Sequence, residues 1–211
     1  MAPTPRPVPA VRPVARPDAA VVAAALARAF DDDPVMMFLL PDDESRPRRL
    51  TAMFSILTRH VHLKHEGSEV GLRDGTIAAA SLWDPPGHWR VPLSSQIRQA
   101  IPLVRAFGTR LPTIMRTLGT IEQDHPKEPH WYLATLGTDP SAQGLGLGGA
   151  LLRSRLDRCD EEEIPAYLES SKESNIAYYE RFGFKVTGEL PLPGKGAPPV
   201  WPMWRDPERR L

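Results

Sequence analysis

Four glycines between a predicted strand and a predicted helix form the part of this sequence best suited to bind an anion. Residues 131–136 alternate in side-chain bulk, which favours a strand, and Asp139-Pro140 ends it. Apolar residues return at helical spacing over 150–156. The turn between the two elements contains Gly144, Gly146, Gly148 and Gly149. Because glycine adopts backbone angles closed to other residues and has no side chain, main-chain N–H groups here and at the helix start can face a ligand together, and a diphosphate fits such donors.

Two other phosphate-binding loops must be separated from this one. Residues 144–149 satisfy the G-x-G-x-x-G spacing of dinucleotide-binding folds, with Glu169 at a plausible distance to hold a ribose. Such folds need several more strand-helix units, and only residues 150–211 follow the turn. The nucleoside-triphosphate loop requires Lys and then Ser or Thr after its last glycine, whereas Gly149 precedes Ala150-Leu151. A glycine turn that serves geometry alone is the remaining alternative to an anion site.

A third kind of phosphate-binding loop is accompanied by a second motif later in the sequence. Gln143-Gly144-Leu145-Gly146-Leu147-Gly148 resembles the pyrophosphate loop Q/R-x-x-G-x-G/A of the GNAT acetyltransferases, and residues 175–184 resemble that superfamily's N…Y-E-x-x-G-F signature. One predicted helix and one predicted strand separate the two motifs, which is the order in the superfamily. Within it, residues 126–135, the glycine loop, residues 168–171 and residues 179–184 resemble puromycin N-acetyltransferase and its relatives. The amino-terminal part is only faintly similar, so the resemblance implies the cofactor rather than the acceptor.

This resemblance implies acetyl-CoA as co-substrate and assigns roles to several residues. Main-chain groups of residues 136–138 would pair with the pantetheine arm as a strand would, and a backbone N–H there would polarise the thioester oxygen. Tyr179, four residues before the glycine of G-F, would protonate the departing sulfur, because a phenol is protonated at neutral pH. Asn175 would contact the pantetheine or phosphate region. The implied cofactor-binding residues are Leu136, Gly137, Thr138, Gln143, Gly144, Leu145, Gly146, Leu147, Gly148, Gly149 and Asn175.

The general base is the role in which this sequence departs from the superfamily. Several members carry a glutamate on the strand before the glycine loop, where this chain has Tyr132. Acetylation of an amine needs a group that removes a proton, and we predict Glu169, at the end of the next predicted strand, as that group. The alternatives are another carboxylate, His130, or water acting after the amine has lost its proton in solution. A salt bridge to a nearby arginine is the competing interpretation of Glu169.

The elements that must position these residues predict a mixed α/β fold in which helices flank a central sheet. Residues 1–16 hold five prolines and three arginines without apolar periodicity, and we predict a disordered arm there. A single acetyltransferase domain is expected over residues 17–211, with residues 17–124 shaping the acceptor pocket and residues 125–205 binding acetyl-CoA. Helices are predicted over 18–30, 46–65 and 93–121, a hairpin joins 70–72 to 76–83, and strands are predicted at 131–136, 164–171 and 201–204. The resemblance implies the GNAT-type fold, whose sheet is mostly antiparallel.

Composition argues against several classes of partner. The chain has 26 Lys and Arg against 26 Asp and Glu, so no overall charge draws it to nucleic acid or to an anionic membrane. Its single cysteine, Cys159, cannot form an internal disulfide, and no apolar run is long enough for a signal or membrane helix. We therefore expect a cytoplasmic monomer or homodimer.

Three clustered histidines raise the question of a metal site. His60 and His62 point to nearly opposite sides of a helix, so only His62 and His65 could share a face, and no second cluster of ligands completes a site. We expect a solvated basic helix end and no metal.

These observations together predict an acetyl-CoA-dependent N-acetyltransferase acting on a primary amine of a small molecule, with an aminonucleoside or antibiotic-like compound as one possibility. The two alternatives are acetylation of a protein or peptide amine and a CoA-binding sensor without catalytic activity. Retention of Tyr179 favours an enzyme over a sensor.

Overall fold

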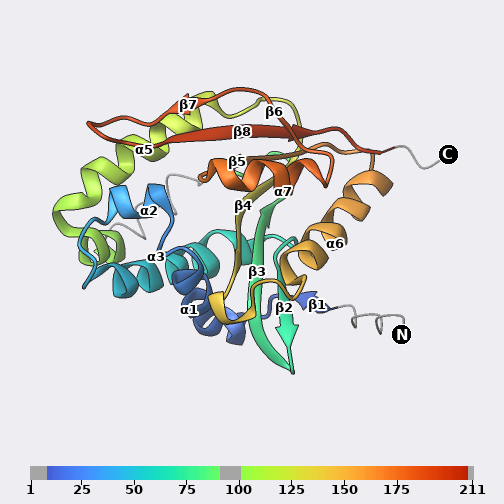
Figure 1. Cartoon of the computed structure of the whole chain (residues 1–211), viewed down its shortest axis with the longest axis horizontal. Helices are drawn as coiled ribbons and strands as arrows, with labels where there is room; N and C mark the ends of the chain where they lie inside the picture. Colours follow the sequence, from blue (N-terminus) through green and yellow to red (C-terminus); the bar gives the residue numbers. More distant parts are fainter. Residues whose placement is uncertain (1–8, 91–100, 209–211) are drawn as a thin grey trace.

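An open eight-stranded sheet runs through the computed structural model, which describes residues 9–90 and 101–208 (Figure 1). The strand order is β1-β2-β3-β4-β5-β8-β6, with β7 pairing with β8 beside this path. Adjacent strands are antiparallel except β4 and β5, which are parallel. The strands are β1 (Ala10–Pro13), β2 (Glu69–Arg73), β3 (Thr76–Asp84), β4 (Trp131–Thr138), β5 (Ala166–Ser170), β6 (Lys185–Val186), β7 (Leu190–Pro191) and β8 (Pro199–Arg205). The predicted mixed α/β fold with a mostly antiparallel sheet is confirmed.

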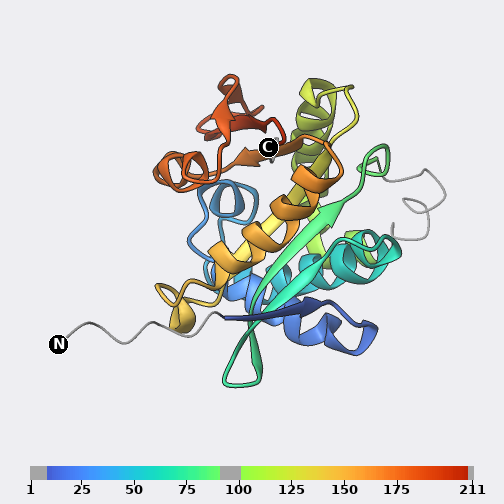
Figure 2. The same cartoon turned by 90° about the vertical axis from the view of Figure 1, so that its right-hand side faces the viewer.

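Helices cover both faces of the sheet. Figure 2 shows α6 across one face of the strands, while α1 and α3 lie behind them. The helices are α1 (Ala19–Ala29), α2 (Pro34–Leu39), α3 (Arg46–His60), α5 (Leu111–Asp124), α6 (Leu147–Glu161) and α7 (Ile176–Glu180), and residues 101–107 are also helical. Within residues 9–90 and 101–208, no helix is both long and apolar enough to cross a membrane.

Alternation along β3 divides the core between these two layers. Ala80 and Leu82 belong to the buried cluster that α1 and α3 cover, whereas Ala79 packs in the cluster that contains Leu151 of α6. Successive side chains of a strand point to opposite faces, so one apolar strand serves both layers. The nine residues of β3 are therefore buried almost throughout, with only its first two residues less covered.

The predicted hairpin is confirmed in its turn as well as its strands. β2 and β3 pair with Arg73 opposite Thr76, and Asp74 and Gly75 take positive φ angles of 50° and 77°. Two successive positive φ angles fit the right-handed twist of the strands, which is why Asp-Gly is favoured at this position.

The predicted disordered arm is wrong for its carboxyl-terminal part. Residues 10–13 form β1, which pairs antiparallel with β2 at the edge of the sheet, and Arg12 makes an ion pair with Asp18 at 2.6 Å. An edge strand tolerates proline because one row of its N–H groups needs no partner, so composition alone did not exclude it. Residues 1–8 lie outside the described residues.

The helix predicted to reach residue 65 ends earlier. α3 stops at His60, and a 3₁₀ turn follows over His62–Lys64. His62 is only 4% exposed, and its Nδ1 lies 2.8 Å from a carboxylate oxygen of Asp84, so the expectation of a solvated helix end is wrong for this residue. Asp84 is distant in sequence, and only folding brings β3 beside the turn.

The helical stretch predicted over residues 93–121 is interrupted. Gly108 has a φ of 50° and opens a 3₁₀ turn, after which α5 begins at Leu111. Residues 91–100, which include the predicted start of this stretch, lie outside the described residues.

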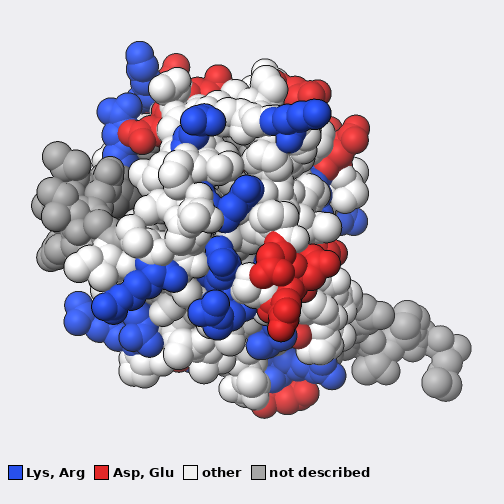
Figure 3. Space-filling view, turned by 90° about the vertical axis from the view of Figure 1, so that its left-hand side faces the viewer, with Lys and Arg blue, Asp and Glu red and all other residues white. Residues whose placement is uncertain are grey.

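Figure 3 shows basic and acidic side chains side by side on the face that carries α2, α3 and α5. Arg46 at the start of α3 is buried and pairs with both Asp31 and Asp43.

Candidate functional site

The two parallel strands of the sheet separate soon after they begin. β4 and β5 pair only through Trp131 with Ala166 and Tyr132 with Tyr167. Beyond Tyr132, β4 stays paired with β3 as far as Thr138, but no strand of the described residues pairs with its other edge. Main-chain donors and acceptors on that edge, over residues 133–138, can therefore bind an extended ligand in the way that a further strand would.

The glycine turn lies at the end of β4, where the sequence predicted it. Gly144 and Gly146 take φ angles of 76° and 83°, and Gly146 is the residue that caps α6, with no side-chain oxygen bonded to the helix start. A glycine cap supplies no side-chain acceptor for the first N–H groups of α6, and the helix dipole places positive charge there. Gly148 is required by a close approach, because a Cβ there would lie 2.9 Å from the Tyr178 hydroxyl. These features make a site for an anion at the start of α6.

A single open cavity of about 930 Å³ joins the diverging strands to the glycine turn. Its walls include both motifs found in the sequence. All the predicted site residues except Leu145 line it: Leu136, Gly137, Thr138, Gln143, Gly144, Gly146, Leu147, Gly148, Gly149, Glu169, Asn175 and Tyr179. Leu145 points outward and is 45% exposed.

Both tyrosines of α7 line this cavity. Tyr179 is the more buried, and burial raises the pKa of its phenol above the ordinary value of 10, so the hydroxyl is a proton donor across the neutral range. Within the described residues its hydroxyl makes no hydrogen bond. Tyr178 is less buried and lies over the first turn of α6.

Glu169 is held on β5 by neighbours that the sequence did not reveal. The Tyr132 hydroxyl donates a hydrogen bond of 2.9 Å to Oε2, and Nδ1 of His125 lies 3.5 Å from Oε1. The carboxylate is 8% exposed, and Oε1 is buried without a hydrogen-bond partner. No arginine of the described residues pairs with it, so the salt bridge considered as an alternative is not formed. Tyr132, at the position where the resemblance had implied a glutamate, therefore positions another glutamate.

A second carboxylate reaches the cavity from the turn between α1 and α2. Asp33 accepts hydrogen bonds from the backbone N–H groups of Val35 and Met36 at the start of α2 and from the Ser171 hydroxyl. Burial raises its pKa, and the Ser171 hydrogen bond opposes that change. Next to it, Asp32 pairs with Lys172 at 2.7 Å. The amino-terminal half thus supplies acidic groups to a wall that β5 completes.

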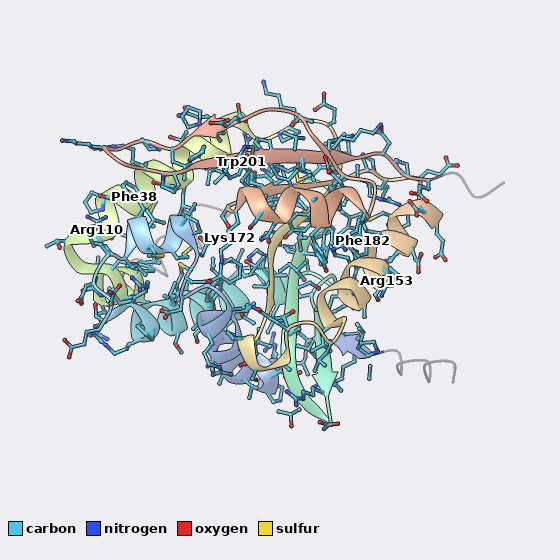
Figure 4. The ribbon with its side chains drawn as sticks, viewed as in Figure 1. Phe38, Arg110, Arg153, Lys172, Phe182 and Trp201 are labelled. Atoms are coloured by element: carbon cyan, nitrogen blue, oxygen red, sulfur yellow. The ribbon has the colours of Figure 1, made fainter. Side chains whose placement is uncertain are left out.

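Two arginines at the opposite end of the cavity were missed in the sequence. Arg153 of α6 lies with its guanidinium 5.9 Å from the ring centre of Phe182, and Arg181 lies 5.2 Å from that of Tyr178. Figure 4 shows Arg153 beside Phe182 where α6 meets the end of α7, with Lys172 at the other end of that helix. Neither arginine forms an ion pair with any described residue. The available signal was spacing, since Arg153 falls one helical turn after Gly149.

Comparison with known proteins agrees with this geometry. Residues 82–184 match the acetyltransferase (GNAT) family. The chain is 30% identical over 205 residues to an uncharacterized N-acetyltransferase of Schizosaccharomyces pombe, across 88% of this chain and 78% of that protein.

Two solved structures are also similar. One, from Corynebacterium glutamicum and described as histone acetyltransferase HPA2 and related acetyltransferase, has a TM-score of 0.74 and 27% identity, covering 97% of this chain and 99% of that one. The polyamine N-acetyltransferase of Drosophila melanogaster has a TM-score of 0.62 at 16% identity, covering 94% and 99%, and so shares the fold.

Proposed function

Because this chain belongs to the GNAT family of acetyltransferases and is an N-acetyltransferase, we propose that it transfers an acetyl group from acetyl-CoA to a primary amine of a small molecule. The observation that carries the proposal is the divergence of β4 and β5 beside the left-handed glycine turn. The divergence leaves a strand edge unpaired, and the turn exposes helix-start amides at the end of that edge. The two features suit an extended thioester arm and a diphosphate in that order.

The residues present fit acetyl-CoA, which supplies the activated acetyl group. Main-chain groups of residues 136–138 would hold the pantetheine arm, and an N–H of this stretch would donate to the thioester oxygen as negative charge develops there. Amides of residues 144–149 would bind the diphosphate, with Gln143 and Asn175 at the sides of the cavity. Arg153 and Arg181 would bind the remaining phosphate, on the ribose, because they are cations that line the cavity and no residue of 9–90 or 101–208 forms an ion pair with them.

Glu169 and Tyr179 are the groups placed to move protons. Glu169 Oε1 is buried, lacks a hydrogen-bond partner and belongs to a carboxylate that lines the cavity, so it can accept the proton that the amine nitrogen loses as the amide forms. Tyr179 can donate its phenolic proton to the sulfur as the carbon–sulfur bond breaks. A protonated amine first loses one proton to water, because only the neutral nitrogen can attack the thioester. The neutral nitrogen then loses one proton to Glu169 and the sulfur gains one from Tyr179, so the transfer balances once solvent returns a proton to Tyr179 and removes one from Glu169.

A small cationic amine is favoured by the acidic wall of the cavity. Asp33 and Glu169 contribute carboxylates from two separate parts of the chain, whereas the charge of Asp32 is offset by its ion pair with Lys172, and amines of ordinary basicity arrive protonated. A puromycin-like aminonucleoside remains one acceptor of this class. The similarity to the structure described as a histone acetyltransferase supports a peptide amine as the second candidate.

The proposal is tested by measuring release of free thiol from acetyl-CoA with a panel of amines. The panel contains an aminonucleoside, a polyamine, an arylalkylamine and a lysine-containing histone-tail peptide, and calorimetry measures CoA binding in parallel. Turnover with one of the small amines, and little with the peptide, supports the proposal. Turnover with the peptide alone assigns a protein acceptor instead, and absence of CoA binding contradicts the cofactor site.

A further inference from the structure

Two buried histidines extend from Glu169 away from the cavity. His125 follows α5 and is 6% exposed, and His130 precedes β4 and is 1% exposed. Their Nε2 atoms lie 3.0 Å apart, Nδ1 of His130 lies 2.6 Å from the carbonyl oxygen of Glu128, and Nδ1 of His125 lies 3.5 Å from Glu169 Oε1. His130 and His125 are therefore hydrogen-bonded to each other, and His125 faces Glu169 at ion-pair distance; we call these three residues the His-His-Glu chain.

The hydrogen bonds and charges of the His-His-Glu chain limit how many protons these three residues hold. The carbonyl of Glu128 can only accept, so Nδ1 of His130 carries a proton. If His130 is neutral, its Nε2 must accept from Nε2–H of His125. A neutral His125 then has a bare Nδ1 facing a carboxylate oxygen. If the proton of neutral His125 is on Nδ1 instead, the Nε2 atoms of both histidines are unprotonated and lie 3.0 Å apart. An unprotonated Nδ1 facing a carboxylate oxygen at 3.5 Å sets two lone pairs against each other, whereas one further proton on the chain turns this contact into an ion pair and makes the net charge of the chain zero.

Three positions are open to that proton, and the surroundings favour one. Burial lowers the pKa of His130, which disfavours a charge on that ring. Glu169 already accepts a hydrogen bond from Tyr132, which favours the ionised carboxylate. The His125 ring stacks on Trp89 with 3.7 Å between ring centres, and an aromatic face stabilises a cation.

We propose that His125 carries this proton as an imidazolium and so keeps Glu169 ionised to accept the proton of the acceptor amine. His125 and His130 are then positioning residues, because they act through Glu169. The catalytic part of the inference rests on the proposed function, whereas the protonation of the chain does not. In the reaction Glu169 takes the proton from the nitrogen, the chain then holds one proton more than at rest, and that proton leaves to water through the open cavity.

Other ionisable groups also face the chain. Tyr132 of β4 and Tyr167 of β5 lie against the His125 ring, and burial beside Glu169 raises the pKa of both phenols, so they stay neutral. The carboxylates of Asp84, Asp124 and Glu128 lie farther out and favour positive charge inside.

Nitrogen NMR of the histidine side chains in the free protein at neutral pH tests the chain without turnover. We expect one ring with both nitrogens protonated, assigned to His125 by its loss in His125→Gln, and one neutral ring with its proton on Nδ1, assigned to His130. In Glu169→Gln the doubly protonated ring should become neutral. A neutral His125 in the wild type, or a charged ring that Glu169→Gln leaves unchanged, would overturn the proposal. Wild type and Glu169→Gln decide it even if a histidine variant fails to fold.

The pH dependence of kcat/KM tests the consequence for catalysis. His125→Gln should move the acidic limb to higher pH, with kcat/KM about tenfold lower than wild type at the acid end, because one pH unit of displacement is a factor of ten. His130→Gln should keep the limb in place, since its amide oxygen still accepts from His125, whereas His130→Leu should displace it. Equal limbs in all four proteins would overturn the positioning role. Lack of turnover in wild type would refute the proposed function and leave the NMR result standing.

Discussion

Removing the Arg153 side chain should weaken binding of CoA while leaving binding of 3′-dephospho-CoA unchanged. Arg153 lines the cavity at the end where α6 meets Phe182, and no acidic residue of the described chain pairs with it. The diphosphate is already served by the amides of the glycine turn, so the guanidinium is left for the phosphate on the ribose. A ligand that lacks this phosphate should not sense the change Arg153→Ala.

The solvent exposure of Arg153 and Arg181 determines how much CoA affinity each side chain contributes. Arg153 and Arg181 are exposed, so their contacts with phosphate are partly screened by water and fall near the upper end of surface ion pairs, about 1 kcal/mol each. This corresponds to about fivefold weaker CoA binding for Arg153→Ala and about thirtyfold for the double variant with Arg181→Ala. Because screening rises with salt, the difference between CoA and its dephospho form should narrow at high ionic strength.

Calorimetric titration of both ligands into wild type and variants is the assay. Arg158→Ala is the matched control, because Arg158 lies on the same helix, pairs with Glu162 at 2.6 Å and does not line the cavity. Three results would refute the reasoning: wild type binding both ligands equally, Arg153→Ala weakening both ligands alike, or Arg158→Ala matching the effect of Arg153→Ala.

The remaining predictions concern a proton donor and two glycines. Tyr179→Phe should bind CoA normally and lose about 100- to 10,000-fold in kcat, and an unchanged kcat would remove Tyr179 from the reaction. In the wild type, kcat should show no loss from Tyr179 ionisation below about pH 10, because burial raises the pKa of this phenol and keeps it protonated to higher pH. A φ of 83° costs residues other than glycine about 1–2 kcal/mol, and the nearest atom to a new Cβ at Gly146 is 3.9 Å away, so in Gly146→Ala the free turn can rotate out of this conformation. Binding must then restore the strained turn, and CoA affinity should fall by about 5- to 30-fold. Gly137→Ala should lower stability by about 1–3 kcal/mol in thermal or urea unfolding, because a Cβ there would lie 2.8 Å from a Leu26 methyl of α1. Gly188→Ala, with no atom within 4 Å, is the control for both glycines, and an equal effect there would contradict the explanations.

Local patterns in the sequence determined the parts of this protein that depend on neighbouring residues. The glycine turn between β4 and α6, the hairpin across Asp74-Gly75 and the alternation along β4 each follow from backbone sterics or from a repeat of two. Resemblance in two ordered motifs then led to the family and to the proposal that Tyr179 donates the proton. These inferences needed no information on what lies across the fold.

The acid–base environment was decided by tertiary structure alone. Glu169 could be chosen from its strand, but Tyr132 and His125 reach it only because β4 and β5 are neighbours and because the chain after α5 returns beneath them. Tertiary structure likewise places His62 beside Asp84 and pairs residues 10–13 with the edge of β2. Hydrogen bonds between buried side chains have no sequence period, so partners far apart along the chain become visible only when packing excludes water and brings them together.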